Sequence, residues 1–139
     1  MEFTLQTPAM IFPAISLLML AYTNRFVVLA GLIRDLYEKH QDSPNKQILA
    51  QIINLQKRMK YIKSMQVLGA MSFIGAVLSM LLTLFAQYNE AMVTFSHIIF
   101  ALSLVLLVIS LVYLLKELSI SIEALTIQLQ DIRNKNENN

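Results

Sequence analysis

The chain has 139 residues, of which 56% are hydrophobic and only 14% are charged. Soluble domains carry about a quarter charged residues, so this composition excludes an ordinary soluble domain and indicates a membrane protein. The absence of cysteine excludes disulfides, thiol catalysis and thiolate metal sites. One membrane module fits the length without a separate catalytic domain, and a net charge of +2 gives no sign of nucleic-acid binding.

The first apolar span covers about residues 8–33 and contains Asn24 and Arg25. At about 1.5 Å per residue it is roughly 39 Å long, whereas a hydrocarbon core is about 30 Å thick. The helix therefore tilts or projects beyond the membrane. Pro13 either kinks this helix or marks its start. By the same rise, Arg25 lies roughly 25 Å along the helix, near the inner boundary of the membrane.

A break at residues 41–45 precedes an amphipathic helix that we expect over about residues 45–66, with Ser43 as its cap. Its apolar residues alternate spacings of four and three, which is the heptad pattern of a coiled-coil seam: Ile48, Ile52, Leu55, Met59 and Ile62. Its opposite face is basic and consists of Lys57, Arg58, Lys60 and Lys63. This face predicts contact with anionic lipid, and docking of a cytoplasmic partner is the alternative.

The same helix runs without a breaker into a second span over about residues 67–86. Small residues suited to close helix packing recur there at helical spacing: Ser72, Gly75, Ala76 and Ser79. A third span over about residues 92–115 carries no charge and continues into a helix over about residues 116–133. That helix has a second heptad seam, which consists of Leu111, Leu115, Leu118, Ile122, Leu125, Leu129 and Ile132. The polar residues 134–139 are expected to be disordered.

The basic residues lie between spans one and two and in the tail, and this distribution predicts an external N-terminus and a cytoplasmic C-terminus. We therefore predict an all-α integral membrane protein, in which residues 1–139 form a single module with three transmembrane helices. Spans two and three extend into a cytoplasmic helical stalk. The two seams of this stalk must be buried, against each other or against neighbouring subunits.

The run from Thr7-Pro8-Ala9 through Ala21-Tyr22-Thr23-Asn24-Arg25-Phe26, followed by Leu32-Ile33-Arg34-Asp35-Leu36, resembles a bacterial family of small membrane proteins described only as a domain of unknown function. The resemblance covers nearly the whole chain, and its most specific feature is the Asn-Arg-hydrophobic step in the first helix. It implies a three-helix protein of the bacterial inner membrane and no chemistry. Arg34 precedes Asp35 in this chain, whereas the order is reversed in the relatives, so the resemblance assigns this pair no role.

Arg25 with Asn24 has two interpretations. The favoured one is that Arg25 extends to the inner headgroups or pairs with an acid of the stalk. In the other, Arg25 faces a water-filled axis and sets the anion preference of a pore. The face around it, at Leu18, Ala21 and Val28, offers little to solvate a guanidinium. A buried Arg25 would therefore need a partner from another helix or subunit.

The remaining chemistry-bearing residues argue against catalysis. None of the nine acids falls inside an expected span, whereas proton-coupled transporters usually keep a carboxylate there. His40 and His97 lie on opposite sides of the membrane in the expected topology, and no ligand cluster accompanies either, so we expect no metal site. No serine or threonine has an apparent activating base. We therefore expect no cofactor and no enzymatic activity.

The leading hypothesis is a homo-oligomer that forms an ion-conducting pore, since the small-residue stripe and the heptad seams favour self-association. The first helix would line this pore, with Asn24 and Arg25 as an anion-favouring polar ring at the cytoplasmic mouth. The apolar constriction would consist of Ile11, Phe12, Ile15 and Leu18. The expected partners are membrane lipids, further copies of the chain and ions. The alternative is a non-conducting membrane scaffold or accessory protein whose cytoplasmic stalk binds a partner or organises lipid.

Overall fold

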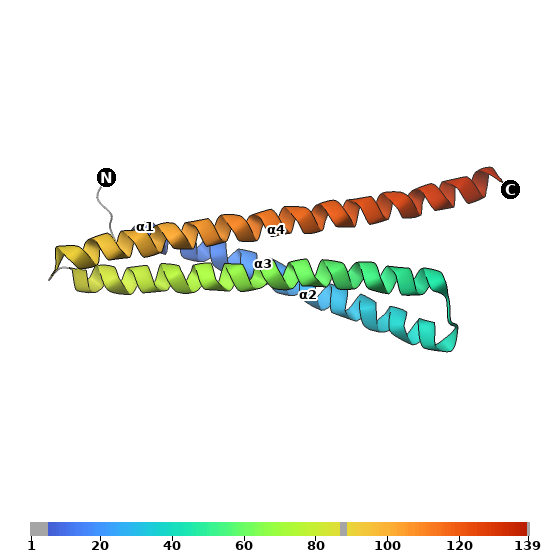
Figure 1. Cartoon of the computed structure of the whole chain (residues 1–139), viewed down its shortest axis with the longest axis horizontal. Coiled ribbons are helices and arrows are strands. Elements are labelled where there is room, and N and C mark those ends of the chain that lie inside the picture. The colour runs from blue at the N-terminus through green and yellow to red at the C-terminus, as the bar shows by residue number, and fades with distance from the viewer. Residues whose placement is uncertain (1–5, 87–88, 139) are drawn as a thin grey trace.

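The computed structural model describes residues 6–86 and 89–138, and the described chain is all-α. A short helix, α1 (Gln6–Ala9), precedes three long ones, which are α2 (Ile11–Asp42), α3 (Lys46–Phe85) and α4 (Glu90–Glu137). Figure 1 shows α3 and α4 as an antiparallel hairpin that α2 crosses at an angle, so that α2 and α4 diverge towards their C-terminal ends. All three long helices are long and apolar enough to cross a membrane.

Apolar side chains cover the outside of these helices. In their most apolar stretches only 17% of residues in α2, 22% in α3 and 17% in α4 are buried inside the molecule. In water so much exposed apolar surface would drive aggregation, whereas in a bilayer the lipid tails cover it. The composition and the exposed apolar surface together indicate a membrane protein.

Pro13 explains where the first long helix begins. The ring of a proline clashes with the carbonyl four residues earlier and has no N–H to donate to it. Four residues before Pro13 is Ala9, the last residue of α1, and the chain makes a turn at Met10 before α2 starts. Pro13 therefore lies in the first turn of α2, where its missing N–H is harmless. The second helix begins close to the proline, and Thr7 lies inside α1.

The connection between α2 and α3 differs from the expected cap. The Ser43 N–H donates to the Lys39 carbonyl at 3.0 Å, so this residue terminates α2. The side chain of Asn45 accepts a hydrogen bond from the Gln47 N–H at 3.0 Å and is the N-cap of α3. The prediction that Ser43 caps the second helix is wrong because Asn45, directly before the first helical residue, has the required extended backbone.

The helices α3 and α4 each run unbroken through their apolar and polar parts, as the sequence predicts. The N-cap of α4 is Asn89, whose side chain accepts from the Ala91 N–H at 3.1 Å. The expectation of disorder from residue 134 onward is wrong for the described residues, since α4 continues to Glu137. An ion pair between Arg133 and Glu137, one turn apart, supports this last part of the helix.

The core lies where α2 crosses the hairpin. Its buried members are Tyr22, Leu29, Ile62 and Met65, against which Leu18, Met19, Leu55, Met59, Tyr113 and Leu114 pack. The first heptad seam, on α3, is therefore buried against α2. The second seam, on α4, is largely exposed beyond Leu118. The expectation that the two seams could pack against each other is corrected, because α4 turns a different face towards α3.

Candidate functional site

Polar side chains at every seventh residue form the contact between α3 and α4. On α4 this line consists of Ser96, Ser103, Ser110 and Glu117, and all four side chains are buried. Facing them on α3, again seven residues apart, are Ser79, Ser72, Met65 and Arg58. Each pair lies one heptad further from the α3–α4 loop than the last. A seven-residue repeat keeps one contact line between two long helices that coil gently around each other.

The serines of this line tie the two backbones together. The hydroxyls of Ser72 and Ser103 each donate to the carbonyl of the other residue, at 2.8 Å and 2.6 Å. Ser79 and Ser96 repeat the arrangement at 3.1 Å and 2.9 Å. Inside a membrane an interhelical hydrogen bond of this kind contributes about 0.6 kcal/mol on average. No single bond of this kind contributes much stability, but the repeated pairs together fix the register of the hairpin.

The small residues of α3 let the two helices approach closely. A Cβ added at Gly75 would lie 3.1 Å from the Ser103 Cβ, which is closer than side chains normally pack. Ser72, Ala76 and Ser79 are buried in the same contact. The predicted packing stripe is thus present, but it is used within one chain, and its role in contacts between subunits is corrected.

The third helix joins the line through Tyr22. The Ser110 hydroxyl donates to the Met65 carbonyl at 2.7 Å and lies 3.2 Å from the Tyr22 hydroxyl, which comes from α2. Tyr22 is buried, and so are Ile15 and Leu29, seven residues before and after it. Helix α2 therefore also presents a heptad line to the hairpin.

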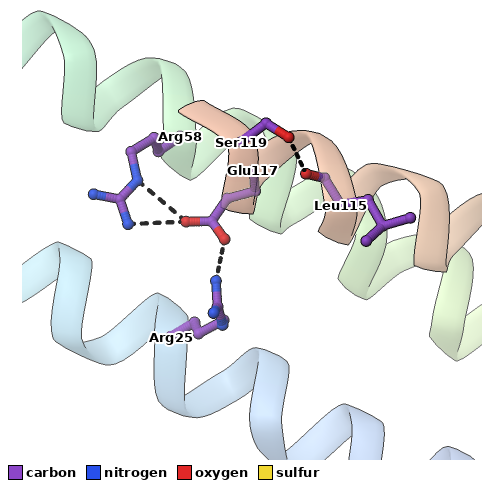
Figure 2. Close-up of polar contacts among 5 residues, drawn as sticks. All are labelled: Arg25, Arg58, Leu115, Glu117 and Ser119. Atoms are coloured by element: carbon purple, nitrogen blue, oxygen red, sulfur yellow. Dashed lines mark hydrogen bonds and ion pairs between the residues drawn. The ribbon is translucent and has the colours of Figure 1, made fainter. Parts of the chain in front are cut away.

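Glu117 continues the serine line and joins all three helices (Figure 2). Its carboxylate is fully buried, and both of its oxygens are occupied. Oε1 accepts from Arg58 Nε at 3.1 Å and from Arg58 Nη2 at 2.9 Å. Oε2 accepts from Arg25 Nη1 of α2. We name Arg25, Arg58 and Glu117 the charge triad.

The triad is an ion-paired group with an excess positive charge. A buried carboxylate is tolerated only when it is paired and hydrogen-bonded, and here two guanidiniums satisfy it. The arginines are less enclosed, with side-chain exposures of 36% for Arg25 and 19% for Arg58. Two cations against one anion leave a net charge of about +1 at this level, by formal charges. The carboxylate has no free oxygen to act as a base or a metal ligand.

The three residues of the triad lie at different positions relative to the apolar spans of their helices. Arg25 lies inside the first apolar span, whereas Glu117 follows the third span and Arg58 precedes the second. The part of α2 that follows Arg25 therefore lies beside the polar part of α3, and Leu29 belongs to the buried cluster against which Leu55 and Met59 pack. The favoured interpretation of Arg25 offered two environments, the inner headgroups or an acid of the expected stalk, and the structure shows an ion pair with Glu117.

Two members of the triad were not assigned this role from the sequence. Arg58 was expected on the basic, lipid-facing surface, and this is corrected, because its guanidinium turns inward to Glu117. Glu117 was not singled out at all. The signal that could have identified it is its position seven residues after Ser110, on the line that already contains Ser96 and Ser103.

The residues proposed to line a pore mostly contact other helices of the same chain. Ile15 is fully buried, and Leu18 packs against the core. The rings of Phe12 and Phe73 lie 5.2 Å apart between centroids. Ile11 is half-buried, and Asn24 is exposed on the outer face of α2. One face of α2 thus packs against α3 and α4, and Asn24 is not on that face.

The other basic residues and the histidines are distributed on the surface. Lys57, Lys60 and Lys63 are all exposed on α3, as the sequence suggests. His40 accepts a hydrogen bond at Nδ1 from the Asn45 N–H at 3.4 Å, and so contributes to the turn between α2 and α3. Within the described ranges, 6–86 and 89–138, no three histidine, aspartate or glutamate side chains lie together.

Comparison with known proteins identifies a family and no activity. The chain belongs to the family described as protein of unknown function (DUF2721), whose sequence model matches residues 5–127. The match includes all of the charge triad and the serine line. Neither a curated protein nor a solved structure matches the chain.

Proposed function

We propose that this member of the DUF2721 family is a homo-oligomeric, non-conducting scaffold of a bacterial inner membrane. In this proposal the N-terminus and the α3–α4 loop lie outside, and the α2–α3 turn and the end of α4 lie in the cytoplasm. The basic residues of α3 and of the α4 end support this orientation, because positive charge is retained on the cytoplasmic side.

The charge triad marks the inner boundary of the membrane in this proposal. From Gln6 to Arg25 the rise along α1 and α2 is about 29 Å, close to the thickness of a hydrocarbon core. Arg58 and Glu117 lie at the same level, outside the apolar runs of their helices. The three helices would then cross the membrane on one side of the triad and project into the cytoplasm on the other.

The observation that supports a scaffold is the uncovered apolar seam at the end of α4. Helix α4 continues for about 30 Å past Glu117. Along that stretch the seam is exposed, at 65% for Ile122, 57% for Leu125, 59% for Leu129 and 58% for Ile132. A heptad seam in water is stable only when another helix covers it.

A second copy of the chain fits this seam. Figure 1 shows that α2 diverges from α4 at this end, and the exposed fractions of the seam residues show that the described part of the chain leaves them largely uncovered. All copies share one orientation in the membrane, so their α4 ends meet in parallel. Four positions beside the seam are uncharged, at Ser119, Ser121, Thr126 and Gln128. The equivalent position beside Ile132 is Arg133, which is paired with Glu137 of its own helix, so parallel copies meet little like-charge repulsion along the seam.

The test is the mass of the purified complex in mild detergent, with the bound detergent subtracted. We expect at least a dimer, and a lower mass for the double variant Leu125→Asp/Leu129→Asp. The matched control is Ile127→Asp/Gln130→Asp, which adds the same charge on the same helix outside the seam. A monomeric wild-type complex would refute the proposal, and so would equal dissociation by both double variants.

A pore lined by α2 is the second candidate, and the exposed Asn24 favours it. An amide on the outer face of a membrane helix gains from water or from a partner subunit. In this version Asn24 faces the axis, while the triad holds α2 in place behind it. Flux of chloride from proteoliposomes would support the pore if it is lost on Asn24→Leu. Absence of chloride flux at high protein density would refute the pore, and the scaffold would be the remaining proposal.

A further inference from the structure

A cavity lies between α3 and α4 at the level of the charge triad. It has a volume of about 310 Å³, and its lining residues are Lys57, Lys60, Tyr61, Ser64 and Tyr113. Lys116 is not part of the lining but lies against one of its residues, with Nζ 5.8 Å from the centroid of the Tyr113 ring. The rings of Tyr61 and Tyr113 lie 6.1 Å apart between centroids and form its wall. We name this the tyrosine–lysine cavity.

The cations of this cavity are not neutralised. Within residues 6–86 and 89–138, Lys57, Lys60 and Lys116 form no ion pair. The nearest acid in the sequence, Glu117, has both oxygens occupied by arginines. Two lysines in the lining, and a third against one of its tyrosines, attract an anion of matching size.

The cavity also offers neutral donors. Among the described residues, neither the Tyr61 nor the Tyr113 hydroxyl has a hydrogen-bond partner, although both rings are half-buried. The Ser64 hydroxyl already donates to the Lys60 carbonyl at 3.1 Å. Two phenol hydroxyls and three ammonium groups are a donor set for the oxygens of a phosphate.

The surroundings of the cavity indicate a lipid as the source of that phosphate. Met71, seven residues on from Ser64, and Ile109, four residues before Tyr113, continue the same two helix faces towards the membrane. Both are exposed, at 51% and 40%. A phosphate seated between the lysines would therefore have an apolar surface directly next to it, along which acyl chains can lie. Tyrosines are enriched at this depth in membrane proteins.

We infer that the tyrosine–lysine cavity binds the phosphate headgroup of an anionic phospholipid. The lysines supply the charge attraction, and the two tyrosine hydroxyls donate to the phosphate oxygens. The inference rests on the proposed membrane boundary at the triad and does not depend on oligomerisation. It gives Lys57 and Lys60 a defined ligand and adds Lys116, Tyr61 and Tyr113 to their site.

The experiment is native mass spectrometry of the full chain in a neutral detergent, titrated separately with phosphatidylglycerol, phosphatidylcholine and inorganic phosphate. The site variant is Lys57→Gln/Lys60→Gln/Lys116→Gln. The matched control is Lys39→Gln/Lys46→Gln/Lys135→Gln, which removes the same charge at exposed positions outside the cavity. Each lysine near a lipid surface contributes about a fivefold factor in affinity, so we expect about a hundredfold loss for the site variant.

The outcomes separate the possible sources. Tight retention of phosphatidylglycerol that falls in the site variant, stays in the control and falls further on Tyr61→Phe/Tyr113→Phe supports the inference. Equal retention of phosphatidylcholine, or equal loss in both lysine variants, overturns it. Site-dependent binding of inorganic phosphate without a preference for phosphatidylglycerol overturns the lipid assignment. The same spectra report subunit number, so a monomer that retains the lipid refutes the scaffold while leaving the site intact.

Discussion

Replacing Glu117 tests the physical account of the charge triad most directly. Glu117→Gln keeps the shape of the side chain but removes the charge that holds Arg25 and Arg58 together. The amide NH₂ group would also face a guanidinium, which has only donors. Removing one partner from a buried ion pair costs about 3–5 kcal/mol, and Glu117 is fully buried with both oxygens in use. We therefore expect a loss of free energy of unfolding in that range.

The arginines are expected to follow in the order of their burial. Arg58→Leu leaves the carboxylate with a single donor, from Arg25, and we expect the second-largest loss. Arg25→Leu leaves Glu117 with both hydrogen bonds from Arg58. Because the Arg25 side chain is 36% exposed, its contribution is closer to that of a surface pair, about 1 kcal/mol or less.

The distinguishing variant replaces all three residues with methionine. A buried ionic group exchanged as a whole for apolar residues of similar volume is often neutral or stabilising. The triple variant Arg25→Met/Arg58→Met/Glu117→Met is therefore expected to recover most of the stability that Glu117→Gln loses. The assay is unfolding by added dodecyl sulfate, followed by energy transfer between dyes on cysteines introduced at the exposed Lys39 and Gln130. The chain has no native cysteine to interfere.

Two results would refute this reasoning. A cost below about 1 kcal/mol for Glu117→Gln would mean that the carboxylate is hydrated and behaves as a surface pair does. If the triple methionine variant were as unstable as Glu117→Gln, the three charged groups would contribute net stability relative to apolar residues of similar volume.

The hairpin register and the close contact give two further predictions. The cysteine pair Ser79→Cys/Ser96→Cys is expected to form a disulfide on mild oxidation. The pair Ser79→Cys/Ser103→Cys is displaced by about 10 Å along the helix and is not expected to form one. The assay is gel mobility after proteolysis of the loop, and equal oxidation of both pairs would contradict the register. Gly31→Ala, where an added Cβ meets nothing within 4 Å, is expected to stabilise α2 by up to about 1 kcal/mol. In Gly75→Ala the added Cβ would lie 3.1 Å from the Ser103 Cβ, so this variant is expected to destabilise the hairpin in spite of the helix propensity of alanine. Equal changes in the free energy of unfolding for Gly31→Ala and Gly75→Ala would show that the contact with Ser103 relaxes.

The sequence predicted the helices and their continuity because these depend on local pattern. The apolar runs, the prolines and the break after Asp42 give three long helices, and the structure has three. The first of them, α2 (Ile11–Asp42), begins three residues later and ends nine residues later than the expected span of about residues 8–33. The need of Arg25 for a partner was also readable, since its neighbours on α2 cannot solvate a guanidinium. The identity of that partner was not, because Arg25, Arg58 and Glu117 lie at unequal depths in the apolar pattern. Only the relative register of the helices brings them level.

The contact face of α4 could be missed for a physical reason. The seam at Leu111, Leu118 and Leu125 is the more apolar heptad, and in water such a seam would be buried first. In a bilayer an apolar side chain gains little by leaving the lipid, so small and hydroxylated residues face the neighbouring helix instead. The line through Ser103 and Ser110 is less apolar than the leucine seam, yet it is the line that packs against α3.

In the proposed membrane placement, the charge triad lies where α4 passes from lipid into water, so the two parts of this helix have different surroundings. Before Glu117, the apolar face of α4 needs no protein cover, because lipid tails are as apolar as leucine. After Glu117 the same heptad continues in the proposed aqueous region, where each exposed leucine or isoleucine forgoes about 1.5–3 kcal/mol of burial free energy. The distance of this seam from Glu117 is fixed, because both belong to one unbroken helix, α4. If Glu117 sets the membrane depth as proposed, the uncovered seam lies at a defined height, and identical copies present it at the same height.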